Sequence, residues 1–195
     1  MPGRLLSPVD RTTPLRYEEI EPDLKGYTDP NGGVWLPFDD YDRWLTQHRS
    51  TSPSPPPPDT DTTPPAVIED SPAGKLCPED GAFLIRRRVS AEIEFHVDRC
   101  GHCGGVWLDP HEWQTLRAHG LAKSLALVFT DAYQAKLRAE LQAQSHRQRL
   151  ETVLGSADLT RIEQFADWAN THEHRGMLLA HLQRLVESTG PGGSD

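Results

Sequence analysis

Two stretches decide the fold, CPED at residues 77–80 and CGHCGGVWLD at residues 100–109. Each stretch holds two metal-binding side chains separated by two residues, and 19 residues lie between Asp80 and Cys100. This spacing is close to that of four-cysteine zinc sites, in which about 15–20 residues separate two Cys-x-x-Cys pairs. The pattern predicts one Zn²⁺ held by two distant turns. The expected ligands are Cys77, Asp80, Cys100 and Cys103.

The identity of the fourth ligand stays open at this point. Asp80 has the right spacing, and carboxylate oxygens bind zinc at about 2.0–2.2 Å, so Asp80 is the preferred interpretation. His102 lies between two thiols and would point away if both of them bind the ion. His96 is expected on the strand face opposite Phe95 and Val97, towards solvent. Water is the remaining candidate, which would make the site resemble an open catalytic centre.

A β-hairpin is expected between the two turns, because apolar residues alternate there with polar ones. The alternating residues are Phe83, Ile85, Ile93, Phe95 and Val97, with the chain reversal near residues 89–91. Turn, hairpin and turn together form a zinc ribbon. A helix should follow, with Asp109 as its N-cap, Pro110 at the first helical position and Glu112 three residues after the cap.

The pentapeptide GGVWL occurs twice, at residues 32–36 and 104–108, which indicates an internal repeat. SPVD at residues 7–10 resembles CPED at 77–80 in the same order. The alignment pairs Cys77 with Ser7, Asp80 with Asp10, Cys100 with Thr28 and Cys103 with Asn31. Residues 1–48 are therefore predicted to be a degenerate, metal-free copy of the ribbon that leans on the second copy or on the helices. Its expected aromatic cluster is Trp35, Phe38, Tyr41 and Trp44.

Residues 76–113 resemble the bacterial TFIIB-like zinc-finger (zf-TFIIB) family, whose pattern runs CPxC or CPxD, a hairpin, and then CxxCGGVWLD. A degenerate second match covers residues 6–45. The resemblance implies zinc binding and a ribbon fold, and it implies little about mechanism. The departure from the pattern is Asp80, in a position usually drawn as cysteine.

The rest of the chain has a different character. Residues 49–73 form a proline-rich linker, since eight of the 17 prolines lie there and apolar residues are almost absent. Residues 74–114 form the predicted zinc ribbon. Apolar residues recur at three- and four-residue steps over 115–188, which favours a helical hairpin or bundle, and 189–195 reads as a flexible tail. The predicted fold class is therefore α+β.

Composition excludes several protein classes. The 195 residues carry a net charge of −9, which argues against a general nucleic-acid binder. No stretch approaches the roughly 20 apolar residues of a membrane span, and the N-terminal residues lack the apolar core of a signal peptide. Three cysteines, an odd number, argue against a disulfide framework. We therefore expect a cytoplasmic protein that does not bind membranes.

The preferred functional hypothesis is a non-enzymatic binding or adaptor module with a protein partner, in which zinc is structural. One alternative is a transcription-related regulator that contacts nucleic acid through Arg86, Arg87 and Arg88, although the hairpin also carries Glu92 and Glu94. A second alternative is a thiol-disulfide oxidoreductase, since CGHC at 100–103 is the motif of disulfide isomerases. Two glycines follow that motif, where an oxidoreductase would continue a helix.

Overall fold

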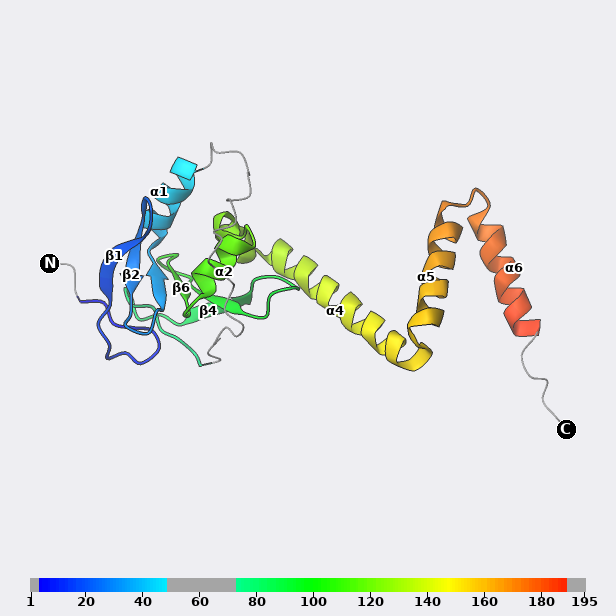
Figure 1. Cartoon of the computed structure of the whole chain (residues 1–195), viewed down its shortest axis with the longest axis horizontal. Coiled ribbons are helices and arrows are strands. Elements are labelled where there is room, and N and C mark those ends of the chain that lie inside the picture. Colours follow the sequence, from blue (N-terminus) through cyan, green and yellow to red (C-terminus); the bar gives the residue numbers. More distant parts are fainter. Residues whose placement is uncertain (1–3, 49–72, 189–195) are drawn as a thin grey trace. The chain divides into compact units, whose positions relative to one another are not determined.

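The computed structural model describes residues 4–48 and 73–188 (Figure 1). It divides the chain into two compact units, residues 1–139 and 140–195. The predicted tail and all of the predicted linker except Ala73 lie outside the described residues. The division falls after Ala139, and the helices between residue 114 and this point supply part of the first unit's core.

The first unit is built on one antiparallel sheet of six strands. In spatial order the strands are β1 (Arg16–Glu21), β2 (Leu24–Thr28), β3 (Val34–Leu36), β6 (Val106–Leu108), β5 (His96–Cys100) and β4 (Leu84–Arg88). Three of them precede residue 49 and three follow residue 73. The two VWL segments, β3 and β6, pair in the middle with Trp35 opposite Trp107. The two predicted ribbon segments therefore share one continuous sheet.

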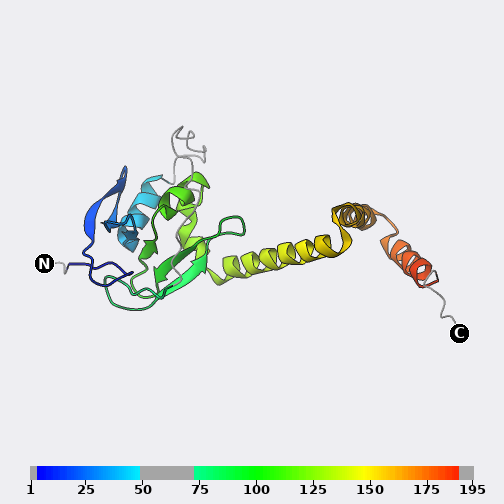
Figure 2. The ribbon, with the colours of Figure 1, turned by 60° about the horizontal axis from the view of Figure 1, so that its bottom comes forward.

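Every residue of β3 and β6 is buried, because both faces of the sheet centre are covered. Val34 and Leu36 face a core shared with the helices α1 (Phe38–His48), α2 (Glu112–Ala118) and α3 (Leu125–Val128), and the short 3₁₀-helix η1 (Ala122–Ser124). Figure 2 shows the sheet and its helices from a second direction. Trp35 and Trp107 face the opposite side, where they pack with Leu15 and two cysteines.

Residues 4–48, which we call the first half of this unit, pack against its second half, residues 73–139, including the helices there. Such packing is expected for so small a segment without metal. The Tyr41 hydroxyl donates a hydrogen bond of 2.8 Å to the Ala122 carbonyl, and the Trp44 ring meets Trp113 edge to face at 5.6 Å. The predicted cluster of four aromatic residues is wrong, however. Trp35 packs on the other face of the sheet, and Phe38 is 44% exposed.

The hairpin between the turns is present as β4 and β5, but two details differ from prediction. Ile93 and Phe95 are buried in the loop that precedes β5 and not in the strand, and Phe83 is 76% exposed before β4. The apolar alternation therefore marks a shorter hairpin with a larger, partly buried connection over residues 89–95.

The helix after the second turn begins at Glu112, so the predicted N-cap at Asp109 is wrong. His111 precedes the helix with φ 72°, and the Asp109 carboxylate binds other partners, described below. One element of the predicted capping box remains, because Glu112 Oε2 accepts the Asp109 backbone N–H at 2.9 Å.

The second unit contains the end of α4 (Asp131–Leu154), α5 (Ser156–Thr171) and α6 (Arg175–Ser188). Gly155 (φ 82°) separates α4 from α5, and no side chain caps the described start of α5 by a hydrogen bond. Helices α5 and α6 contact each other. None of the described helices combines the length and apolar character that a membrane crossing requires.

Two glycines allow the central tryptophans to pack. A Cβ atom at Gly105 would lie 2.3 Å from Cζ2 of Trp35, and one at Gly33 would lie 2.3 Å from Cζ2 of Trp107. Gly105→Ala should therefore lower the free energy of unfolding by about 1–3 kcal/mol, the usual cost of overpacking a core. Urea unfolding measures this loss, with Gly74→Ala as the control because its Cβ would meet nothing within 4 Å. Equal stability of both variants would contradict the packing described here.

Candidate metal centre

The first turn brings Cys77 and Asp80 to the same point. The Cys77 N–H donates to the Ala82 carbonyl at 2.7 Å, and the Gly81 N–H donates back to the Cys77 carbonyl at 3.0 Å. Asp80 Oδ1 accepts the Ala82 N–H at 2.9 Å, and Gly81 has φ 76°. A left-handed residue is needed to close this turn, and glycine supplies it without a steric penalty.

The second turn repeats this design after strand β5. The Cys100 N–H donates to the Gly105 carbonyl at 2.9 Å, and the Gly104 N–H donates to the Cys100 carbonyl at 3.2 Å. Gly104 has φ 77°, a left-handed conformation that glycine adopts without a steric penalty. The turn therefore presents Cys100 and Cys103 on the side that faces the first turn.

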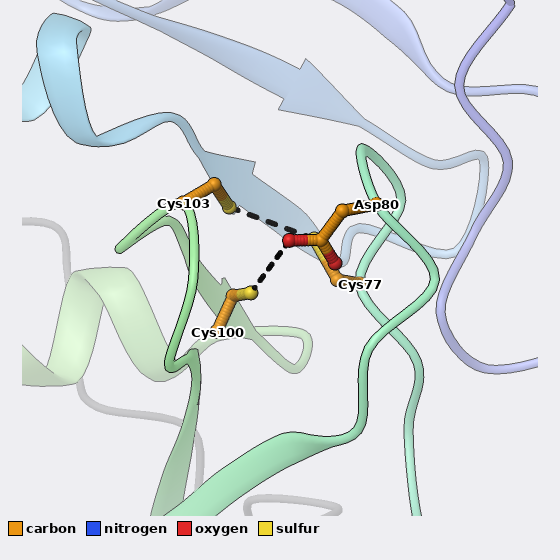
Figure 3. Close-up of side chains that lie close together, drawn as sticks. All are labelled: Cys77, Asp80, Cys100 and Cys103. Atoms are coloured by element: carbon orange, nitrogen blue, oxygen red, sulfur yellow. Dashed lines mark hydrogen bonds between the residues drawn. The ribbon is translucent and has the colours of Figure 1, made fainter.

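The structure brings all four predicted ligands together (Figure 3). Their ligand atoms lie within 4.8 Å of one another, and the group could hold a metal ion. The Cys77 and Cys103 sulfur atoms are 3.6 Å apart, and the Cys100 thiol donates to Asp80 Oδ2 at 3.3 Å.

These distances agree with tetrahedral zinc geometry. Zn–S bonds of about 2.3 Å at tetrahedral angles place two sulfur ligands about 3.8 Å apart, and a sulfur and an oxygen ligand about 3.6 Å apart. These two separations, 3.6 Å and 3.3 Å, are slightly shorter than the tetrahedral values, and no two ligand atoms of the group lie more than 4.8 Å apart, so a central ion needs only modest shifts of the side chains. Three sulfurs and one carboxylate oxygen are also ligand types that zinc accepts.

The ionisable side chains of the group differ in the direction of their pKa shifts. Burial raises the pKa of Cys103 to about 11 and also raises the pKa of Cys77. Both thiols therefore hold their protons at neutral pH unless a divalent ion replaces them. Asp80 differs, because the hydrogen bond from the Ala82 N–H lowers the pKa of its carboxyl. Its side chain is 29% exposed, at the open side of the group.

Neither alternative histidine joins the group. His102 Nδ1 lies 3.7 Å from Asp80 Oδ2, but its side chain is 78% exposed. His96 lies on β5 with Nδ1 3.5 Å from Arg86 Nη2, away from the thiols. Among the described residues, the only such group of three or more metal-binding side chains is Cys77, Asp80, Cys100 and Cys103.

Comparison with known proteins agrees with this geometry. Residues 76–119 match the family model described as "Transcription factor zinc-finger". This segment is a TFIIB-like zinc-finger domain. No curated protein and no solved structure matches the chain. The match covers both turns, the hairpin β4–β5, strand β6 and helix α2.

The first half has turns like those of the zinc-finger domain, with different side chains. The Ser7 N–H donates to the Thr13 carbonyl and the Arg11 N–H to the Ser7 carbonyl, which places Ser7 where the domain has Cys77. The Asp29 N–H donates to the Gly33 carbonyl, as Cys100 does to Gly105. Asp29, and not the predicted Thr28, therefore makes the backbone hydrogen bond that corresponds to that of Cys100.

Asp29 joins the two turns of the first half. Its carboxylate accepts the Ser7 hydroxyl at 3.1 Å and the backbone N–H groups of Asn31 and Gly33 at 2.8 Å and 3.0 Å. The two turns of the first half are thus joined by a direct hydrogen bond between buried side chains. Sequence reasoning missed Asp29, since the second turn is one residue shorter in this half.

A buried ion network lies under the zinc-finger domain, and sequence reasoning missed it too. Lys75 Nζ lies 2.7 Å from Asp98 Oδ2 and 2.9 Å from Asp109 Oδ2, and all three side chains are at most 4% exposed. Trp107 Nε1 donates to the second oxygen of Asp109 at 2.7 Å. Burial lowers the pKa of Lys75, but its hydrogen bonds and charge interactions with both carboxylates outweigh burial, so the pKa is raised. Burial also raises the pKa of Asp98.

Proposed function

We propose that the chain is a zinc-binding protein in which Cys77, Asp80, Cys100 and Cys103 hold one structural Zn²⁺. The observation that carries this proposal is the convergence of the four ligand atoms within 4.8 Å, from two turns with 19 residues between them. Four protein ligands complete a tetrahedral shell and leave no position for substrate, as in structural zinc sites. The ion then closes the end of the hairpin β4–β5.

The wider role that we propose is a non-enzymatic binding or adaptor module with a protein partner. Large apolar side chains exposed on the second unit, among them Met177 at 75%, support a binding role, because such groups mark interaction surfaces. A cytoplasmic location is part of the proposal. It is supported by the three unpaired cysteines, which a reducing compartment keeps available as metal ligands.

We also propose that residues 1–48 are a second copy of the ribbon that has lost its metal. Support comes from the matching backbone hydrogen bonds of Ser7 and Cys77 and of Asp29 and Cys100. The symmetric pairing of Trp35 with Trp107 supports it as well. In this copy the hydrogen bond between Ser7 and Asp29 substitutes for a bridging ion.

The oxidoreductase alternative has less support. Cys100 ends strand β5 and residues 101–103 form a turn, whereas a disulfide isomerase places its first cysteine at a helix N-terminus. Turnover in an insulin-reduction assay would favour this alternative.

The nucleic-acid alternative is also less supported. The Arg88 guanidinium donates to the Ser90 carbonyl at 2.9 Å, and Arg87 donates to the Arg86 carbonyl at 3.3 Å, so two of the three arginines stabilise their own hairpin. A salt-dependent shift on DNA or RNA that is lost in the triple Arg→Ala variant would favour it.

Substitutions at Asp80 test the ligand set directly. Asp80→Ala should weaken zinc binding by more than about 10–100-fold, the usual effect of losing even a hydrogen-bonded neighbour of a metal ligand. Asp80→Cys should retain binding, because it restores the four-cysteine pattern. Competition with a chelating dye measures both affinities, and cobalt substitution reports whether a fourth sulfur joins the shell. Unchanged affinity in Asp80→Ala would remove Asp80 from the site.

A further inference from the structure

The second unit leaves most of its apolar side chains uncovered. Of its described residues, only Leu159 and Ala169 are buried, and α6 has no buried residue. Six large apolar side chains of α5 and α6 with exposed fractions between 38% and 64% are Ile162, Trp168, Leu179, Leu182, Leu185 and Val186. A helix pair of this length is not stable in water without a covered apolar face, so another surface must pack against it.

The exposed residues have a directional arrangement. On α6, Leu179, Leu182 and Val186 follow three- and four-residue spacing and share one face. On α5, Ile162, Phe165 and Trp168 recur at three-residue steps. Two contacting helices that each carry such a face are half of a four-helix bundle, and a second pair completes the core.

We propose that the second unit is a dimerisation element, in which the α5–α6 pairs of two copies of this chain pack into a four-helix bundle. The available area is sufficient. The six side chains expose on the order of 600 Å² per chain, and since about 60% of an interface is apolar, the full contact would reach roughly 1,000 Å² per partner. A stable interface of standard size needs about 800 Å² per partner.

Charge favours a second copy over other occupants. Residues 140–188 carry seven acidic and five basic side chains and no lysine, a net charge of −2. Such a surface is poorly suited to anionic lipid or nucleic acid, which require basic residues. Arg147 pairs with Glu163, and Arg161 with Asp158, so opposite charges already alternate along the helices. A nearly neutral, mixed surface can meet its own copy without strong repulsion.

The first unit offers no matching surface among its described residues. Its exposed large apolar side chains are divided among separate elements, with Val9 in the first turn, Phe83 before β4 and Leu127 in α3. None of these elements presents a stripe that could extend the faces of α5 and α6. The symmetric solution, a two-fold dimer, is also the commonest form of soluble oligomer.

Sedimentation of the zinc-loaded full chain at about 100 μM tests the proposal, and a dimer is expected. The double variant Leu179→Glu, Leu182→Glu should weaken the dimer by at least about 100-fold, because it places two charges in the bundle core. The matched control Ala180→Glu, Arg184→Gln adds the same charge to the opposite face of α6 and should change dimer affinity by less than about threefold. Both variants should keep wild-type zinc content, which separates this result from the zinc proposal.

Several results would overturn dimerisation through this face. One is a wild-type chain that stays monomeric at 100 μM. This result would count against dimerisation both if contacts within the same chain protect the α6 amides from exchange and if the monomer binds anionic vesicles instead. Another is a dimer that survives Leu179→Glu, Leu182→Glu. Dissociation of the control to the same extent would show that net charge, and not the apolar face, governs association.

Discussion

Removal of zinc should lower the free energy of unfolding of the first unit by on the order of 10 kcal/mol, which is the typical free energy of zinc binding at small structural sites. The reason is that the ion closes two turns whose thiols lie inside the core. Cys77 and Cys100 pack directly with Trp35 and Trp107 beneath the sheet. Because Trp35 belongs to the first half of the unit and packs against these cysteines, loss of the ion should disorder both halves together.

Chelation with EDTA, followed by thermal unfolding and hydrogen exchange, measures this effect. Strand β2 should lose protection along with β5, although only β5 carries a metal ligand. Zinc-saturated EDTA at the same concentration is the control for the chelator itself. If the treated protein releases one zinc and still unfolds at the same temperature, the ion is not a structural element.

The convergence of the four side chains could be predicted from the sequence because its information is local. Cys77 and Asp80 lie in one turn and Cys100 and Cys103 in another, and the spacing between the turns specifies a hairpin. Turn chemistry is local in the same way, since Gly104 adopts a left-handed conformation that favours glycine. Such features depend on a few neighbouring residues, and distant packing does not alter them.

Long-range features could not be read in the same way. The pairing of β3 with β6 joins residues 72 positions apart, and the repeated GGVWL sequence indicates similarity but not contact. Asp109 shows the same difficulty. Its local context indicates a helix cap, but its carboxylate instead accepts hydrogen bonds from the buried Lys75 ammonium and the Trp107 indole. The equivalence of Asp29 with Cys100 was hidden by a one-residue difference in turn length, which shifts an alignment anchored on GGVWL.

The Lys75 network leads to the second large effect. Lys75→Met should destabilise the first unit by about 3–5 kcal/mol, the usual cost of breaking a buried ion pair by removing one partner. The methionine fills a similar volume, so the loss reflects the two carboxylates and not a cavity. Asp98 and Asp109 would then remain buried without the shared cation that lies within 2.9 Å of both. Lys25→Met, an exposed lysine on β2, is the matched control.

The pH dependence distinguishes a charge effect from a packing effect. Burial already raises the pKa of Asp98 in the folded protein above its ordinary value of 3.8, and removal of Lys75 should raise it further. A raised folded pKa contributes stability below the unfolded pKa, and this contribution is lost as the pH rises through the folded value. The penalty of Lys75→Met should therefore be largest at neutral pH and shrink towards pH 4. Because wild type and variant are compared at each pH, acid effects on the shared thiol ligands cancel. A penalty that stays constant from pH 7 to pH 5 would mean that Lys75 acts through its aliphatic stem and not through its charge.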